Sequence, residues 1–314
     1  MLTVAAIGFI MGAVIGSFLN VVVWRIPRGM SLCRPPSTCP KCGHRILPWE
    51  NIPILSWICL RGRCSKCHLP ISWKYPAGEA AVGLLYALIS VRVWQEGLPL
   101  ETLLPWWWFA GTMLSLARID AEHGIIPNRV TYSGMVAAAI LSIAFPLSRP
   151  AMVAPQNPNY GGLLTGKILD AIKNTALPET ISLRLASLAD CICGLLAGFI
   201  ILGTVYYLGE KAMAKWRKSR PAAKDVPEEP LGKGDIKMLA MTGAFIGADA
   251  VVFTLCGGCI LAFMAALVIA AKNTKKASPA FTQVPFAPFF AVPSIIWVTS
   301  GNWLYFLYKI CENS

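Results

Sequence analysis

The feature that most constrains this chain is a succession of apolar runs, each close to the length that crosses a bilayer as a helix. Such a crossing takes about 17–25 residues. Runs near that length occupy residues 3–24, 78–95, 102–119, 130–146, 185–208, 238–253, 254–271 and 286–308. Only 14% of the 314 residues are charged, against about 25% in an average soluble domain. The pattern predicts an all-α polytopic membrane protein with eight transmembrane helices. Counts of seven or nine are alternatives, because the sixth and seventh runs are contiguous.

Basic residues are concentrated in two of the segments that separate these runs. Residues 25–76 hold nine Lys and Arg against one acid, Glu50, and residues 209–237 hold eight. Because Lys and Arg accumulate in cytoplasmic loops, we expect both segments to face the cytoplasm and both termini to lie outside. Residues 147–183 are nearly charge-balanced, which predicts an external loop. The net charge of +12 is then mostly a topology signal, and no nucleic-acid partner is expected.

The first basic segment contains two Cys-x2-Cys pairs, in "CPKC" and "CSKC". Their thiols belong to Cys39, Cys42, Cys64 and Cys67. Cytoplasmic thiols stay reduced, and two such pairs supply four ligands for tetrahedral Zn²⁺. Four thiolates leave no position for water, so we expect one structural zinc per chain. A metal-free reduced loop and a pair of redox dithiols are the alternatives. The predicted domains are a first helix over 1–24, a cytoplasmic zinc-binding domain over 25–76 and a membrane core over 77–314.

Two aspartates are expected to meet at the cytoplasmic face. Asp120 follows the third run, in "LARIDAEHGIIPN", and Asp235 precedes the sixth, in "GKGDIK". Ionisable residues at membrane depth are candidates for function, and two adjacent carboxylates cannot both ionise readily. One could then take a proton from water while the other donates to a carbonyl oxygen, as in an aspartic protease. The alternative is two ordinary helix-end acids favoured by the helix dipole.

The residues around these acids carry further expectations. Gly232 and Gly234 leave space beside Asp235, which predicts the approach of an extended substrate backbone. Lys237 is expected either to steady the charge or to anchor its helix at the interface. Pro127 and Asn128 are expected to end one element and cap the next helix.

Several segments resemble one family. "GKGDIK" is similar to the GxGDxK motif of the type IV prepilin peptidases, which are bacterial inner-membrane aspartic proteases. "GSFLNVVVWRIPRG" resembles the first helix of the family and its exit. "NIPILSWICLRGRCSKC", followed by "ISWKYPAGE", resembles its cysteine domain, and "DAEHGIIPN" its first catalytic segment. The resemblance covers most of the chain and implies that Asp120 and Asp235 are the catalytic dyad. The chain departs from the family at Lys233, where a small or apolar residue is common, and at Gly78, where a larger residue is common.

The resemblance also implies a reaction. The family cleaves the basic leader of type IV prepilins and type II secretion pseudopilins after a glycine, at the cytoplasmic membrane face. Members with four cysteines also N-methylate the new N-terminal residue with S-adenosylmethionine, so the expected partners are precursor peptides and the lipid bilayer. Neither an oligomeric state nor a methyl-donor site is predicted. Two rival hypotheses are a peptidase without methyltransferase activity, and a transporter or channel whose aspartates bind ions.

A basic leader meets a basic segment at this face. The positive charge of residues 25–76 would repel this leader. Local acidic residues or anionic lipid must therefore attract the leader to the membrane face. The candidates are Glu79, Glu122 and the cluster formed by Asp225, Glu228 and Glu229. We favour the cluster, because it lies a few residues before Asp235; a solvated acidic linker is the alternative.

Overall fold

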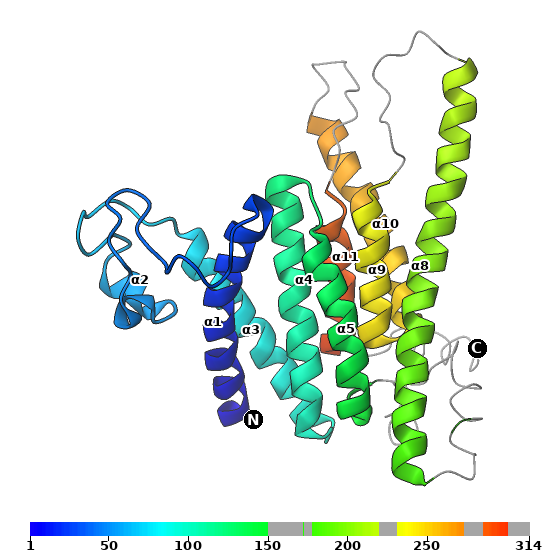
Figure 1. The fold of residues 1–314 in the computed structure, drawn as a ribbon, viewed down its shortest axis with the longest axis horizontal. Coiled ribbons are helices and arrows are strands. Elements are labelled where there is room, and N and C mark those ends of the chain that lie inside the picture. The colour runs from blue at the N-terminus through cyan, green and yellow to red at the C-terminus, as the bar shows by residue number, and fades with distance from the viewer. Residues whose placement is uncertain (150–171, 173–177, 220–230, 273–284, 301–314) are drawn as a thin grey trace. The chain divides into compact units, whose positions relative to one another are not determined.

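The computed structural model describes residues 1–149, 172, 178–219, 231–272 and 285–300. These residues are mostly helical and contain no β-strand, which confirms the expected all-α class. The longer helices are α1 (Leu2–Arg25), α3 (Lys74–Gln95), α4 (Leu103–His123), α5 (Asn128–Ala144), α8 (Glu179–Ser219), α9 (Lys233–Ile246), α10 (Ala248–Lys272) and α11 (Ala287–Ser300) (Figure 1). Shorter elements are η1 (Ile26–Arg28), η2 (Pro48–Asn51), α2 (Leu55–Cys59), η3 (Leu100–Thr102) and η4 (Pro146–Ser148). The chain divides into two compact units, Met1–Ile119 and Asp120–Ser314.

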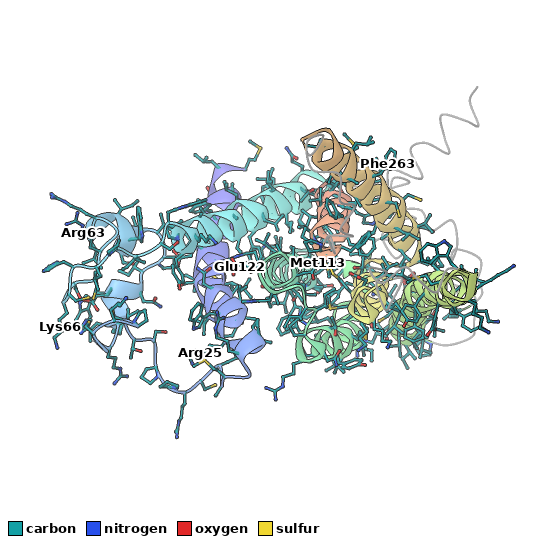
Figure 2. The ribbon with its side chains drawn as sticks, turned by 90° about the horizontal axis from the view of Figure 1, so that it is seen from above. Arg25, Arg63, Lys66, Met113, Glu122 and Phe263 are labelled. Carbon is teal, nitrogen blue, oxygen red and sulfur yellow. The ribbon has the colours of Figure 1, made fainter. Side chains whose placement is uncertain are left out.

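Four helical segments in the described residues are long and apolar enough to cross a membrane. They are Leu2–Arg28, Lys74–Gln95, Glu179–Trp216 and Ala248–Val268. Large apolar side chains remain uncovered on them; on α10, Ile260 and Phe263 are 61% and 65% exposed, and Phe263 points outward in Figure 2. A continuous apolar surface of this kind requires contact with something other than water. The segments therefore indicate a membrane protein.

In the first unit, α1 packs closely against α3 through small residues. Gly8, Gly12 and Gly16 recur at every fourth position and are buried. A Cβ on Gly12 would lie 2.6 Å from the Val82 carbonyl oxygen, and one on Gly16 would lie 2.9 Å from the Cα of Glu79. Glycine at these positions lets the two backbones approach, which is the usual basis of helix association in a bilayer.

In the second unit, α9 lies between α5 and α8 (Figure 1). Its side chains are buried without interruption from Met238 to Ile246. The contact with α8 again depends on glycine, because a Cβ on Gly198 would lie 2.5 Å from the carbonyl oxygen of Leu239. This packing holds α9 in place and so determines where the residues at its first turn lie.

The structure corrects the predicted boundary between the sixth and seventh runs. The break lies at Gly247, whose φ of 89° is a conformation that side chains with a Cβ rarely adopt. Ile246 therefore ends α9 and Ala248 begins α10, whereas hydropathy placed the break at 253–254. The error arose because the residues on both sides of Gly247 are apolar, so composition alone does not reveal the turn.

The predicted cytoplasmic loop 209–237 is helical at both described ends. α8 continues to Ser219 and α9 begins at Lys233. The cluster of Asp225, Glu228 and Glu229 lies outside the described residues, as do most of the predicted external loop 147–183 and residues 301–308 of the last run.

The α8–α9 contact makes a prediction with a control on the same helix. Gly198→Leu should displace α9, because overpacking a close backbone contact costs about 1–3 kcal/mol or more. Gly203→Leu should leave the protein intact, because no atom lies within 4 Å of a Cβ built there. Thermal unfolding in detergent, followed by tryptophan fluorescence, measures the difference. Equal melting temperatures for the two variants would contradict this account of the packing.

Candidate functional site

The four predicted cysteines form a compact cluster in the first unit. All four sulfur atoms lie within 4.8 Å of one another, with Cys39 Sγ 3.8 Å from Cys67 Sγ and Cys42 Sγ 4.0 Å from Cys64 Sγ. Four thiolates around one Zn²⁺ at about 2.3 Å would be about 3.8 Å apart. Backbone amides of Cys42 and Lys41 lower the pKa of Cys39, which favours the thiolate that binds metal. The donor set and its spacing therefore fit a tetrahedral metal.

The two Cys-x2-Cys turns have the same backbone geometry. The Gly43 amide donates to the Cys39 carbonyl at 2.9 Å, and the His68 amide donates to the Cys64 carbonyl at 3.0 Å. Gly43 and His68 occupy the same left-handed position, with φ of 69° and 56°. Glycine adopts this conformation readily, whereas histidine does so at a cost. The same tight turn therefore follows both Cys-x2-Cys pairs.

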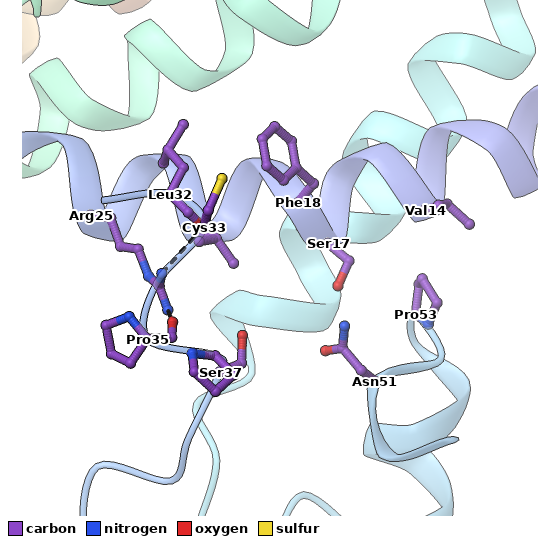
Figure 3. A pocket seen from close by; sticks show the side chains of 12 residues that line it. Val14, Ser17, Phe18, Arg25, Leu32, Cys33, Pro35, Ser37, Asn51 and Pro53 are labelled. Carbon is purple, nitrogen blue, oxygen red and sulfur yellow. Dashed lines mark hydrogen bonds between the residues drawn. The ribbon is translucent and has the colours of Figure 1, made fainter. Parts of the chain in front are cut away.

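Arg25 ties the start of the cysteine segment to the end of α1. Its guanidinium donates to the carbonyls of Ser31, Leu32 and Pro35 at 2.9, 3.2 and 2.6 Å, beside a cavity of about 340 Å³ (Figure 3). The side chain is 7% exposed. In the sequence, Arg25 is one of the nine basic residues that predict a cytoplasmic segment. Its three contacts with carbonyl groups give it a structural role as well.

A polar network in the first unit accounts for Gly78. The Arg118 guanidinium donates to Asn20 Oδ1 at 2.7 Å, and Asn20 donates to the Tyr75 carbonyl at 3.1 Å. A Cβ on Gly78 would lie 2.5 Å from Arg118 Nη1. Glu79, proposed above as an acid for the leader, is 9% exposed and accepts the Ile54 amide at 2.7 Å. One of its carboxylate oxygens is therefore engaged within the chain, and the attraction of a leader by Glu79 stays a prediction.

Asp120 and Asp235 lie together in the second unit. Asp120 is near the end of α4, Asp235 is in the first turn of α9, and they are 7% and 6% exposed. Asp120 Oδ2 accepts the backbone amide of Ala287, the first residue of α11, at 3.0 Å. Asp235 Oδ1 is buried and has no hydrogen-bond partner among the described residues. The two carboxyls thus have unequal surroundings.

Burial governs the electrostatics of this pair. Neither residue lies in the four described segments that are long and apolar enough to cross a membrane, and both lie just outside the apolar runs 102–119 and 238–253. Loss of water raises the pKa of Asp120, and the Ala287 amide opposes that rise. Loss of water also raises the pKa of Asp235, the nearby Asp120 carboxylate raises it further, and the Gly232 backbone opposes both effects. One proton shared by two acids is the expected state near neutral pH.

The two motif glycines have different neighbours. Gly232 is the N-cap of α9, and a Cβ there would lie 2.9 Å from Asp235 Oδ2. A Cβ on Gly234 would lie 2.7 Å from the Cβ of Ile126, in the segment between α4 and α5. The space beside Gly234 is thus taken by the chain itself, whereas room for a substrate backbone beside Gly232 remains a prediction.

Lys237 and Asn128 link α9 to α5. The Lys237 ammonium donates to Asn128 Oδ1 at 2.7 Å and lies 5.4 Å from the centre of the Tyr132 ring. Asn128 is the first residue of α5, whose N-cap is Pro127 without a side-chain cap. The predicted capping role of Asn128 is therefore wrong, because its side chain turns to Lys237 instead.

Ala287 and Ile126 are the site residues that sequence reasoning missed. Ala287 contributes a backbone amide, which every residue except proline possesses, so its identity gave no signal. Ile126 lies inside the segment quoted around Asp120, but only its contact with Gly234 reveals its part in the site.

Two family models and several curated relatives match this chain. A family model described as the bacterial peptidase A24 N-terminal domain matches residues 10–93, and the model of the type IV leader peptidase family matches residues 107–269. The chain is 29% identical to the prepilin leader peptidase/N-methyltransferase of Pseudomonas putida over 321 residues, which cover 94% of this chain and 90% of the relative. The corresponding protein of Aeromonas hydrophila is 29% identical over 94% of this chain and 90% of its own. The corresponding protein of Dickeya chrysanthemi is 30% identical over 77% of this chain and 74% of its own length.

No solved structure matches the chain significantly. The family model for the leader peptidases nevertheless covers more than half of the 314 residues and contains both buried aspartates. The chain belongs to the type IV leader peptidase family.

Proposed function

We propose that this protein is a bifunctional prepilin peptidase and N-methyltransferase of the bacterial inner membrane. The observation that carries the peptidase half is the buried pair formed by Asp120 and Asp235, within a chain of the leader peptidase family. Relatives that match nearly the whole chain bear the name of both activities. The substrates would be type IV prepilins or type II secretion pseudopilins, cleaved after a glycine at the cytoplasmic face.

The acid pair supports general acid–base hydrolysis. One carboxylate takes a proton from water as the water oxygen attacks the scissile carbonyl, and the other carboxyl donates a proton to the carbonyl oxygen. Because both groups are shielded from bulk water, these charge movements are stabilised by the site rather than by solvent. Asp235 Oδ1, which has no hydrogen-bond partner among the described residues, is available for a substrate group.

The proposed topology has eight spans and places the acids on the cytoplasmic side. The four long apolar segments would be joined as spans by the apolar parts of α4, α5, α9 and α11, and Asp120 and Asp235 would lie just outside these apolar parts, at their cytoplasmic ends. The basic residues of 25–76 and 209–237 support this orientation. The corresponding domains are the helix over 1–24, the cytoplasmic domain over 25–76 and the membrane core over 77–314.

The cysteine cluster supports a structural zinc. Cys39, Cys42, Cys64 and Cys67 would hold the ion with no position left for water. The segment buries few apolar residues, so metal binding would supply much of its folding energy. For the second activity, S-adenosylmethionine would supply the methyl group to the new N-terminal amine, and its binding site is not assigned.

The acid pair predicts loss of cleavage in two variants. Asp120→Asn and Asp235→Asn should each lower cleavage of a prepilin by on the order of 10⁴-fold, because each removes one proton-transfer group. Glu122→Gln, which changes an exposed acid two residues from Asp120, should keep kcat near the wild-type value. Gel assays with purified protein in lipid measure the rates. Cleavage retained by either aspartate variant would exclude the proposed dyad.

The cluster predicts about one Zn²⁺ per chain in protein purified without chelators. Cys64→Ser, which removes the buried member of the four, should lower the zinc content and destabilise the cytoplasmic segment. Cys59→Ser changes an exposed thiol outside the cluster and should bind zinc as the wild type does. Elemental analysis and limited proteolysis provide the readouts. A full zinc complement in Cys64→Ser would reject these four ligands.

The two activities should be separable by mutation. Asp120→Asn should still methylate a substrate that has been cleaved beforehand, since it removes only a group needed for proteolysis. Cys64→Ser should impair methylation more than cleavage. Mass spectrometry of one prepilin, with and without S-adenosylmethionine, reports both steps. Wild-type protein that cleaves but never methylates would favour the peptidase-only alternative, and a cysteine variant that methylates normally but cannot cleave would contradict the division.

A further inference from the structure

We infer that the N-terminus of α11 makes the acid pair asymmetric: the Ala287 amide holds Asp120 as the ionised member, and Asp235 carries the proton. This inference rests on the proposed peptidase function and deepens it by giving each acid a separate role. Ala287 is then a positioning residue that acts through Asp120.

The first observation is the hydrogen bond that Asp120 accepts. Ala287 N lies 3.0 Å from Asp120 Oδ2, and the two residues are separated by 167 positions in the chain. Amides in the first turn of a helix have no partner inside it, and the helix dipole adds positive potential there. A hydrogen bond from such a donor is stronger to a carboxylate than to a neutral acid. Ala287 is fully buried, so water does not compete for the bond. These features favour a charge on Asp120.

The second observation is the missing donor at Asp235. Its Oδ1 is buried and has no hydrogen-bond partner among the described residues. A buried oxygen that carries charge without a donor is costly, whereas a protonated oxygen can itself donate once an acceptor arrives. The first turn of α9 and the Gly232 backbone favour an anion at Asp235, but neither supplies a hydrogen bond to Oδ1. When the pair carries a single negative charge, it is therefore most stable with that charge on Asp120.

The assignment gives each step of hydrolysis a definite proton donor and acceptor. Asp120 takes a proton from water as the new C–O bond forms. The carbonyl π electrons move to oxygen, which receives the proton of Asp235. When the intermediate collapses, the C–N bond breaks, its electron pair goes to nitrogen, and Asp120 returns its proton there. Asp235 takes back a proton from a hydroxyl as the new carboxyl forms, so both acids regain their starting states.

Infrared difference spectroscopy on the full-length protein in lipid nanodiscs tests the proton's location directly. A protonated carboxylic acid has a C=O stretch that a carboxylate lacks. At neutral pH, Asp120→Asn should retain the wild-type band from the buried acid, and Asp235→Asn should lose it. The opposite result would overturn the assignment, and so would loss or retention of the band in both variants.

A backbone variant tests the part played by Ala287. Ala287→Pro removes the amide hydrogen at a helix position that tolerates proline, and Ala287→Gly removes only the methyl group. Loss of a hydrogen bond to a charged group should lower kcat about 10- to 100-fold in the proline variant, with KM within about twofold. The glycine variant should cleave at nearly the wild-type rate. Equal kcat in the two variants would overturn the role of the amide.

The controls separate this inference from the proposed function. If the proline variant does not fold, the infrared measurement still decides the assignment. If either aspartate variant cleaves normally, the peptidase proposal itself fails. If both aspartate variants are inactive but the band is lost in Asp120→Asn and kept in Asp235→Asn, the peptidase proposal stands and only the asymmetry is rejected.

Discussion

A carboxyl group removed from water must be either hydrogen-bonded or protonated, and the second unit of this protein places two such groups together. Asp120 satisfies the requirement through the first amide of α11, and Asp235 is left with an oxygen that has no partner in the described structure. The ends of α4, α9 and α11 bring these groups together and exclude water from them. Each helix contributes one end, so the acid pair depends on three segments that are distant in sequence.

Close helix packing makes that burial possible. α9 is shorter than a typical membrane span, yet its side chains are buried without interruption from Met238 to Ile246. Contact of its backbone with α8 at Gly198, and of Gly234 with Ile126, fixes the helix from two sides. The link between Lys237 and Asn128 adds a polar contact to α5 at the same end. Rigid placement of this kind is what a general acid and base require, because proton transfer depends on hydrogen-bond distances.

The first unit solves a different folding problem. Its long helices associate through glycines, whereas residues 25–76 leave large apolar side chains such as Trp49, Ile58 and Trp73 exposed and form no apolar core. The buried Cys64 and the three other cluster thiols take the place of a core there, and the two similar turns hold their sulfurs at metal-binding distances. Arg25 adds three contacts to carbonyls where this segment leaves α1.

The sequence by itself determined the helical class, the membrane character, the four cysteines that cluster and the two acids that are buried together. These features are local, because apolar length, Cys spacing and an acid beside glycines are visible within a few residues. Tertiary structure alone decided the break at Gly247, the pairing of Gly234 with Ile126 and the turn of Asn128 toward Lys237. It also decided the contact of Asp120 with Ala287, which no sequence pattern indicates. The physical reason is that these contacts use backbone amides, a φ angle and the absence of a Cβ, whose partners become defined only when distant helices pack together.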